Sequence, residues 1–117
     1  LNVDLAPTLL AALGIAPPER MQGRDLAPLY LRESPPAWRT EFFYEHPVLT
    51  SELRIPSSEA LVTRDRKLIR WPAYDHEELF DLVADPREER NLARDPERAA
   101  ELAALRTRLE ELRLAAR

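Results

Sequence analysis

The spacing of apolar residues predicts a short helix near the start of the chain. Between positions 3 and 13, apolar side chains recur at intervals of three and four, as they do on one face of a helix. Asp4 is placed to accept hydrogen bonds from the first free amide groups of this helix. Gly14 and Pro17 supply its end, because glycine favours a helix stop and proline prevents continuation.

A second and longer helix is predicted at the other end of the chain. Asp95 followed by Pro96 and Glu97 combines an N-cap, a first-turn proline and an acid at the positive end of the helix dipole. Leucines then follow at alternating spacings of three and four, and they form one narrow stripe. This stripe must be buried, either on a sheet face of the same chain or on another helix. The leucines are Leu102, Leu105, Leu109 and Leu112.

The middle of the chain alternates between strand patterns and turns. Residues 41–46 are rich in aromatics and predict a strand, which Pro47 ends. Residues 59–71 contain two apolar runs around the polar stretch 64–67, a pattern typical of a β-hairpin. Residues 78–82 predict one further strand. The connections are too short for crossover helices, so antiparallel pairing is favoured.

The remaining segments predict loops. Residues 16–39 are rich in proline and charge and contain one short apolar cluster at 26–31, which predicts a helical turn capped by Asp25. Residues 48–58 also predict a loop. The pattern as a whole therefore predicts an α+β fold, with an antiparallel sheet of about four strands packed by a long C-terminal helix.

Composition removes several classes of function. The chain has 117 residues, enough for one small domain, and its net charge of −4 gives no electrostatic footprint for nucleic acid. It contains no cysteine, which excludes disulfides and thiolate metal sites. No apolar run approaches the roughly 20 residues of a membrane span, and nothing in the sequence assigns a cellular compartment.

The order of these segments resembles the C-terminal end of the type I sulfatases, which belong to the alkaline phosphatase superfamily. VDLAPTLLAALGI at 3–15 and MQGRDLAPL at 21–29 resemble the helix and loop that end the large α/β domain of the family. ELFDLVADPREERNLARDP at 78–96 resembles its last strand and the turn into the terminal helix. FFYEHP at 42–47 and LVTRDRKLIRW at 61–71 fall where its small sheet would lie. The resemblance is to the region found in arylsulfatases and N-sulfoglucosamine sulfohydrolases.

The resemblance implies a division of the chain and a location for the chemistry. Residues 1–39 would end a missing α/β domain, and residues 40–117 would form the C-terminal subdomain that packs against it. The family's formylglycine nucleophile and calcium ligands would lie upstream, so no catalytic or metal-binding residue is predicted here. Residues 34–38 imitate the modification motif, but Trp38 stands where an arginine is needed. The 117-residue chain alone would therefore not hydrolyse a sulfate ester.

His46 is the one candidate for substrate binding. It lies at the end of the aromatic strand, where a side chain can reach a neighbouring cleft, although an imidazole that is merely hydrogen-bonded at a domain boundary is the commoner case. Arg64, Arg66 and Lys67 are expected in the hairpin turn, where they could contact a sulfate or simply be solvated. For the aromatics Trp71 and Tyr74 burial is favoured over stacking on a sugar. His76 is expected to be a solvated turn residue.

Two functions from different classes remain open at this point. In the first, the chain completes a sulfatase and helps to shape a cleft for a sulfated ester or sulfated carbohydrate. In the second, it is a non-enzymatic interaction module whose leucine stripe at 102–112 binds another helix. The two differ in what buries the leucines, because only the first predicts contacts with the hairpin and with the strand at 78–82.

Overall fold

The computed structural model of the protein describes residues 1–47 and 56–116. Most of the loop expected at 48–58 therefore lies outside the described residues. The chain divides into two compact units, residues 1–38 and 39–117, and each is described by itself. The proposed assignment of 1–39 to a larger α/β domain remains a prediction, although this structural division falls beside the same boundary.

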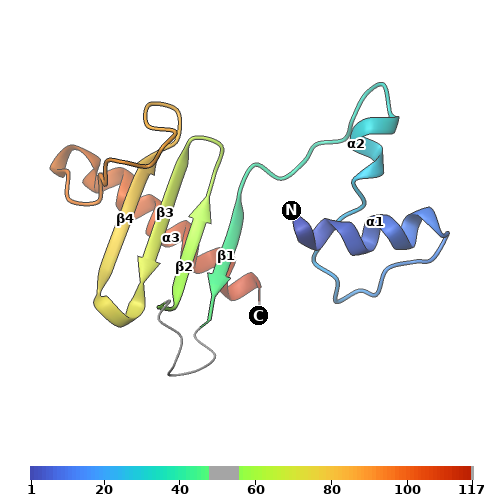
Figure 1. Ribbon diagram of the computed structural model, residues 1–117, viewed down its shortest axis with the longest axis horizontal. Coiled ribbons are helices and arrows are strands. Elements are labelled where there is room, and N and C mark those ends of the chain that lie inside the picture. Colours follow the sequence, from blue (N-terminus) through green and yellow to red (C-terminus); the bar gives the residue numbers. More distant parts are fainter. Residues whose placement is uncertain (48–55, 117) are drawn as a thin grey trace. The chain divides into compact units, whose positions relative to one another are not determined.

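The second unit contains a four-stranded antiparallel sheet whose strands follow one another in sequence order (Figure 1). This confirms the predicted antiparallel sheet. Its members are β1 (Phe42–His46), β2 (Ser58–Val62), β3 (Arg66–Trp71) and β4 (His76–Asp81). A single turn of 3₁₀ helix, η2 (Pro72–Tyr74), joins β3 to β4.

The β2–β3 turn is shorter than the sequence predicted. β3 begins at Arg66, so Arg66 and Lys67 are strand residues and their assignment to the turn was wrong. The Thr63 hydroxyl accepts a hydrogen bond from the backbone N–H of Arg66 at 2.9 Å, and the Thr63 N–H donates to the Arg66 carbonyl at 2.8 Å. These bonds close the chain within one tight turn, because a threonine hydroxyl can replace a backbone partner there.

The long helix α3 (Ala99–Ala115) lies across one face of this sheet (Figure 1). Asp95 caps the preceding 3₁₀ turn, η3 (Pro96–Arg98), by accepting a hydrogen bond from the Glu97 N–H at 3.0 Å, as the sequence predicted. The sheet and the helix meet in a cluster of five buried leucines: Leu61, Leu68, Leu79, Leu102 and Leu109. Leu105 and Leu112 pack against it.

The leucine stripe is therefore buried on the chain's own sheet. Leu109 is fully buried and Leu102 nearly so, and both pack on leucines of β2, β3 and β4. The prediction of intramolecular packing is confirmed. The alternative of a helix-binding module depended on a free stripe, and the buried stripe removes that basis.

Ion pairs flank this leucine core and fix how α3 lies on the sheet. Arg66 Nε donates to Glu101 at 2.5 Å, and the Arg70 guanidinium pairs with Glu110. Side chains at both ends of the core thus join a strand to the helix. Since such pairs have preferred geometry, they favour one orientation of α3 over others that would bury the same leucines.

The first unit contains η1 (Asn2–Asp4), α1 (Leu5–Ala12) and α2 (Ala27–Leu31). Gly14 follows α1 at φ +70°, which confirms the predicted stop. Asp4 was expected to cap α1, but its fully buried carboxylate accepts instead from the Arg24 N–H at 2.8 Å. It therefore ties the helix start to a loop 20 residues later, and that close approach requires the nearby Gly23, where a Cβ would meet the Val3 carbonyl.

Candidate functional site

One end of the sheet brings together a residue from each strand, and we call these four residues the terminal row. β1 and β2 pair His46 with Ser58, and β3 and β4 pair Trp71 with His76. β2 and β3 pair Glu59 with Arg70, so Ser58 and Trp71 come next in the same register. The terminal row is therefore His46, Ser58, Trp71 and His76.

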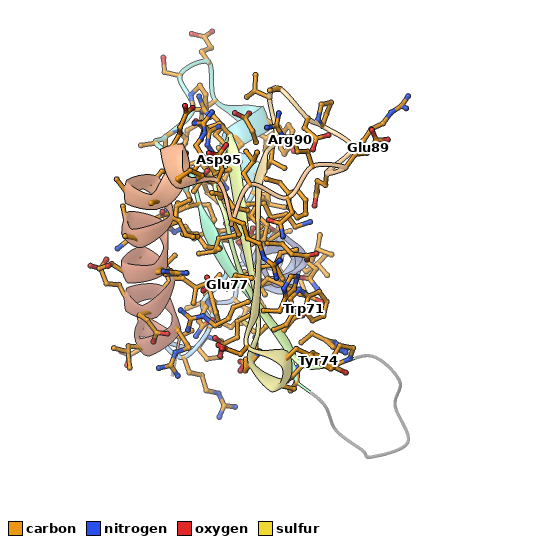
Figure 2. The ribbon with its side chains drawn as sticks, turned by 90° about the vertical axis from the view of Figure 1, so that its left-hand side faces the viewer. Trp71, Tyr74, Glu77, Glu89, Arg90 and Asp95 are labelled. Carbon is orange, nitrogen blue, oxygen red and sulfur yellow. The ribbon has the colours of Figure 1, made fainter. Side chains whose placement is uncertain are left out.

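The terminal row lies on the face of the sheet opposite α3. Side chains alternate along a strand, and Leu61, Leu68 and Leu79 face the helix. Ser58, Trp71 and His76 are each an odd number of residues from the core leucine of their strand, and His46 is an odd number from Phe43, which packs against the core from β1. Figure 2 shows Trp71 and Tyr74 on the far side of the sheet from α3, while Glu77 points toward the helix.

Trp71 is held in place by a neighbouring carboxylate. Its indole Nε1 donates to Glu78 Oε2 at 2.9 Å, and Glu78 Oε1 lies 3.8 Å from His76 Nε2. A hydrogen bond to a charged acceptor is stronger than one between neutral groups. Glu78 therefore holds the indole of Trp71 in one orientation. The same carboxylate also lies near His76.

The first hollow beside Trp71 contains His46. It has a volume of about 340 Å³ and is lined by residues of β1, β2 and β3. Within the described residues, His46 Nε2 is buried and has no hydrogen-bond partner. A buried polar atom without a partner is costly, so this nitrogen is suited to a ligand or to a polar group from elsewhere. The lining residues are Tyr44, His46, Ser58, Ala60, Lys67, Ile69 and Trp71.

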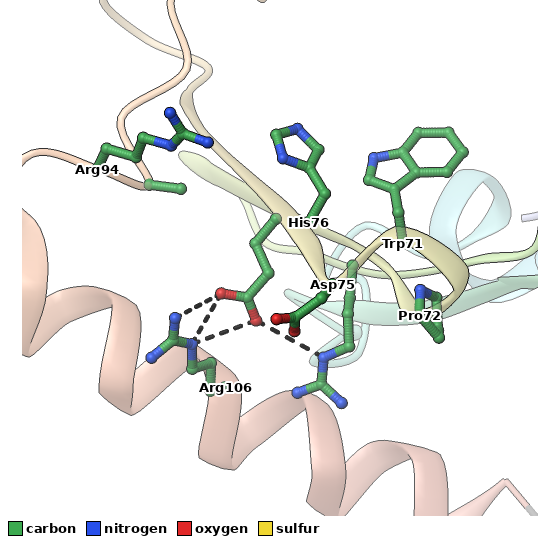
Figure 3. A pocket seen from close by; sticks show the side chains of 9 residues that line it. Trp71, Pro72, Asp75, His76, Arg94 and Arg106 are labelled. Carbon is green, nitrogen blue, oxygen red and sulfur yellow. Dashed lines mark hydrogen bonds and ion pairs between the residues drawn. The ribbon is translucent and has the colours of Figure 1, made fainter.

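A second hollow wraps around the outer edge of β4 and has a volume of about 540 Å³. Figure 3 shows Arg94 and Arg106 on one side of it and Trp71, Pro72 and His76 on the other. Arg106 donates from Nε to Glu77 Oε2 at 2.9 Å and from Nη2 to the same oxygen at 2.5 Å. This hydrogen bonding raises the pKa of Arg106 above its ordinary value and keeps the guanidinium cationic.

A third hollow, of about 380 Å³, is lined in part by Tyr74. Trp71 lines all three hollows, and His76 lines the second and the third. Tyr74 is 67% exposed, so it is not buried against the sheet, and its burial against a larger domain stays a prediction. Tyr74 lies in η2, outside the paired strands, and its side chain is on the surface.

Two of the three basic residues assigned to the hairpin turn are already paired. Arg66 Nη1 lies 3.0 Å from Asp81 Oδ2, and Lys67 Nζ lies 2.6 Å from Glu88 Oε2. His76, expected in a solvated turn, is the first residue of β4. Alternation along the strands would have placed His46 and Trp71 on one face, but no sequence pattern pointed to Arg94 or Glu78 beside them.

The chain's own residues do not fit the cofactors that the resemblance implies. Across residues 1–47 and 56–116, no group of three or more His, Asp or Glu side chains could hold a metal ion. The whole sequence lacks cysteine, and the serine of residues 34–38 is followed by Trp38 rather than arginine. Among the helices of the described part, none is both long and apolar enough to cross a membrane.

Comparison with known proteins places the chain in a family. It is 34% identical over 114 residues to N-acetylglucosamine-6-O-sulfatase of Bacteroides thetaiotaomicron, which covers 95% of this chain and 20% of that protein. It is also 34% identical over 118 residues to Delta 4,5-hexuronate-2-O-sulfatase of the same organism, covering 94% and 23%. The chain thus spans only a small part of these relatives.

Solved structures give the same result. A protein in complex with its substrate D-glucosamine-2-N,6-O-disulfate superposes with a TM-score of 0.82 at 34% identity, over 94% of this chain and 23% of that one. The phosphonate monoester hydrolase of Agrobacterium radiobacter gives 0.80 at 25% identity, over 97% and 25%. A model of the family described as N-sulphoglucosamine sulphohydrolase, C-terminal, matches residues 1–115. The chain therefore belongs to this family of sulfatase C-terminal regions.

Proposed function

We propose that this chain is the C-terminal region of a sulfuric ester hydrolase that acts on a sulfated carbohydrate. The family match over residues 1–115 carries the first part of the proposal. The second part is supported by two relatives named as sulfatases of sugar residues and by a related structure that contains a disulfated glucosamine. Formylglycine and calcium, which the family uses, would be supplied by residues outside this chain.

The terminal row would form part of the substrate cleft. Its aromatic member Trp71 is fixed by Glu78 and can offer a flat surface to a sugar ring. His46 would contact the substrate, because its side chain lines a hollow and its buried Nε2 lacks a partner among the residues described. These residues would position substrate, and they would not take part in bond cleavage.

The apolar surfaces of both units support packing on a larger α/β domain. In the first unit, Leu5 and Leu9 of α1 and Leu13 directly after it are between 57% and 73% exposed. In the second unit, the sheet face opposite α3 carries the half-exposed Tyr44 and the hollow beside Trp71. Large exposed apolar side chains in such numbers are unusual for an isolated domain. We therefore infer that residues 1–39 belong to that domain and that residues 40–117 dock on it.

The test uses the full-length protein and its His46→Ala variant on glucosamine carrying a 6-O-sulfate, with a phosphonate monoester as a second substrate. We expect sulfate release from the sugar, and we expect the variant to raise KM with little change in kcat, because uniform binding would be lost. Preference for the phosphonate ester would overturn the assignment to sulfate. Unchanged kinetics in the variant would remove His46 from the cleft.

A further inference from the structure

We propose that the hollow at the outer edge of β4 binds a second anionic group of a sulfated oligosaccharide, with Arg94 as its main contact. The inference rests on the proposed function and extends it. It predicts that the enzyme prefers a chain of at least two sugar residues with two anionic groups over a sugar with one.

Arg94 is the arginine of this hollow that the fold leaves available. It is exposed in the segment between β4 and α3 and lines the hollow. Its guanidinium has no hydrogen bond or ion pair to any residue within the parts of the chain that are described. By contrast, Arg106 is occupied by Glu77, and Arg70 is paired with Glu110. A free guanidinium can donate two parallel hydrogen bonds to a sulfate or carboxylate.

The charges around the hollow permit an anion to enter. Glu77 would repel one, but its carboxylate is already held by Arg106 and lies 3.7 Å from Arg70 Nε. Arg106 thus offsets the charge of Glu77, while Arg70 is shared between Glu77 and Glu110. Asp75 is the remaining acid of the lining, and it lies in the exposed turn before β4 at φ +47°. The negative charge of Asp75 therefore weakens the binding of an anion, and a neutral residue at this position would strengthen it.

Trp71 links this hollow to the proposed cleft. Its side chain lines the hollow that contains His46 and also the hollow that contains Arg94. A sugar ring that lies on the indole would have one neighbour toward His46 and the other toward Arg94. Pro72 extends the apolar wall on the second side. The volume of about 540 Å³ falls within the range of small-ligand sites and exceeds what a lone sulfate needs.

The experiment compares two substrates and two variants in the full-length protein. The probes are a disaccharide with a sulfate on each sugar and a monosaccharide with one sulfate. Arg94→Gln should raise KM and the calorimetric Kd for the disaccharide about 5- to 20-fold, since a charge-assisted bond is lost. Arg94→Gln should leave kcat unchanged. It should also leave the KM and the Kd for the monosaccharide unchanged. Arg87→Gln, which removes an exposed arginine outside this lining, is the matched control.

A second variant tests whether misfolding, and not loss of the Arg94 charge, explains weaker disaccharide binding. Asp75→Asn removes the opposing charge, and asparagine tolerates the left-handed conformation at this position. It should tighten disaccharide binding about 2-fold, because repulsion between partly exposed charges is modest. An equal effect of Arg94→Gln on both substrates, or none on either, would overturn the subsite.

The binding measurement separates this inference from the proposed function. If the protein hydrolyses neither sugar but Arg94→Gln still weakens disaccharide binding, the subsite stands and the assigned activity fails. If both sugars are hydrolysed and Arg94→Gln binds the disaccharide like the wild type, the activity stands and the subsite fails. Absence of disaccharide binding by the wild-type protein also overturns the subsite.

Discussion

The indole Nε1 of Trp71 donates a hydrogen bond to Glu78 Oε2 at 2.9 Å, and this bond joins neighbouring strands on the face opposite α3. It orients the only residue that lines all three hollows described above. Glu78→Ala should therefore leave the indole free to rotate and should weaken saccharide binding. A hydrogen bond of this kind contributes about 1.5–3 kcal/mol, but it is present with and without substrate, so its loss acts only through the orientation of the indole and KM should rise by up to about 10-fold.

The conservative variant distinguishes orientation from charge. Glu78→Gln retains an acceptor oxygen and should restore most of the binding that Glu78→Ala loses. The indole N–H resonance of Trp71 gives a direct reading, because loss of a strong acceptor moves it upfield toward the value of a solvated indole. An unchanged resonance in Glu78→Ala would show that the hydrogen bond does not form in solution.

Leu109 should dominate the contribution of α3 to stability. It is fully buried among leucines of three strands and of α3. Leu109→Ala should lower the free energy of unfolding by about 2–5 kcal/mol, which combines lost transfer free energy with the cavity that remains. Leu114→Ala, at a position that is 64% exposed, is the control and should change it by less than about 0.5 kcal/mol. Urea denaturation of both variants measures the difference.

The helices and strands with a regular spacing of apolar residues were predictable from the sequence. The turns that join them were less predictable. The leucine stripe of α3 and the Asp95 cap follow from spacing alone, and the structure confirms both. The β2–β3 turn was misplaced, because Arg66 and Lys67 are polar but lie in a strand. Both find partners from distant segments, Glu101 and Glu88 respectively. The local sequence does not show such distant partners. Charged strand residues that form ion pairs therefore look the same in the sequence as the residues of a solvated turn.

The candidate site shows the same limit. His46 was identified because a strand and a proline bracket it, and its role remains a prediction. Arg94 gave no signal, since it is one arginine among many in a charged segment. Its significance comes from what surrounds it: other arginines of the hollow are neutralised by Glu77 and Glu110, and this one is not. Availability of a charge is a property of the fold, and sequence spacing does not record it.

Asn91 should matter more for stability than its exposed position indicates. Its Oδ1 accepts from the Leu79 N–H at 3.0 Å and from the Ala93 N–H at 2.9 Å, and its Nδ2 donates to the Glu77 carbonyl at 3.1 Å. The side chain thus takes the place of a further strand along the edge of β4. Asn91→Ala should cost about 1–3 kcal/mol, because it leaves backbone groups without partners.

Amide exchange at Leu79 tests this directly. The exchange rate of the Leu79 N–H should increase in Asn91→Ala, while the amide of Leu68 in the centre of the sheet should keep its protection. Asn91→Asp keeps the acceptor but loses the donor, so it should protect Leu79 and still be less stable than wild type. Equal protection of Leu79 in all three proteins would contradict the role assigned to the Asn91 side chain.

Stability should fall in acid partly through Asp81. Its carboxylate accepts hydrogen bonds from the Ala84 and Val83 backbone amides at 3.0 and 3.1 Å and pairs with Arg66 at 3.0 Å. These contacts, the Ala84 amide first, lower the pKa of Asp81 below its ordinary value. A lowered folded-state pKa stabilises the protein above the unfolded pKa of about 4, and that stabilisation is lost as pH falls through the folded value.

Asp81→Asn isolates this contribution because it removes the titration and keeps an oxygen that can accept from the Ala84 amide. At neutral pH the variant should be less stable than wild type, since the pair with Arg66 is lost. Between about pH 5 and pH 2 the wild type should lose more stability than the variant, so that the two urea midpoints converge. Asp75→Asn, which removes an exposed carboxylate from the turn before β4, is the charge-matched control. A constant gap between wild type and Asp81→Asn down to pH 2 would show that Asp81 stays ionised or makes no such contacts.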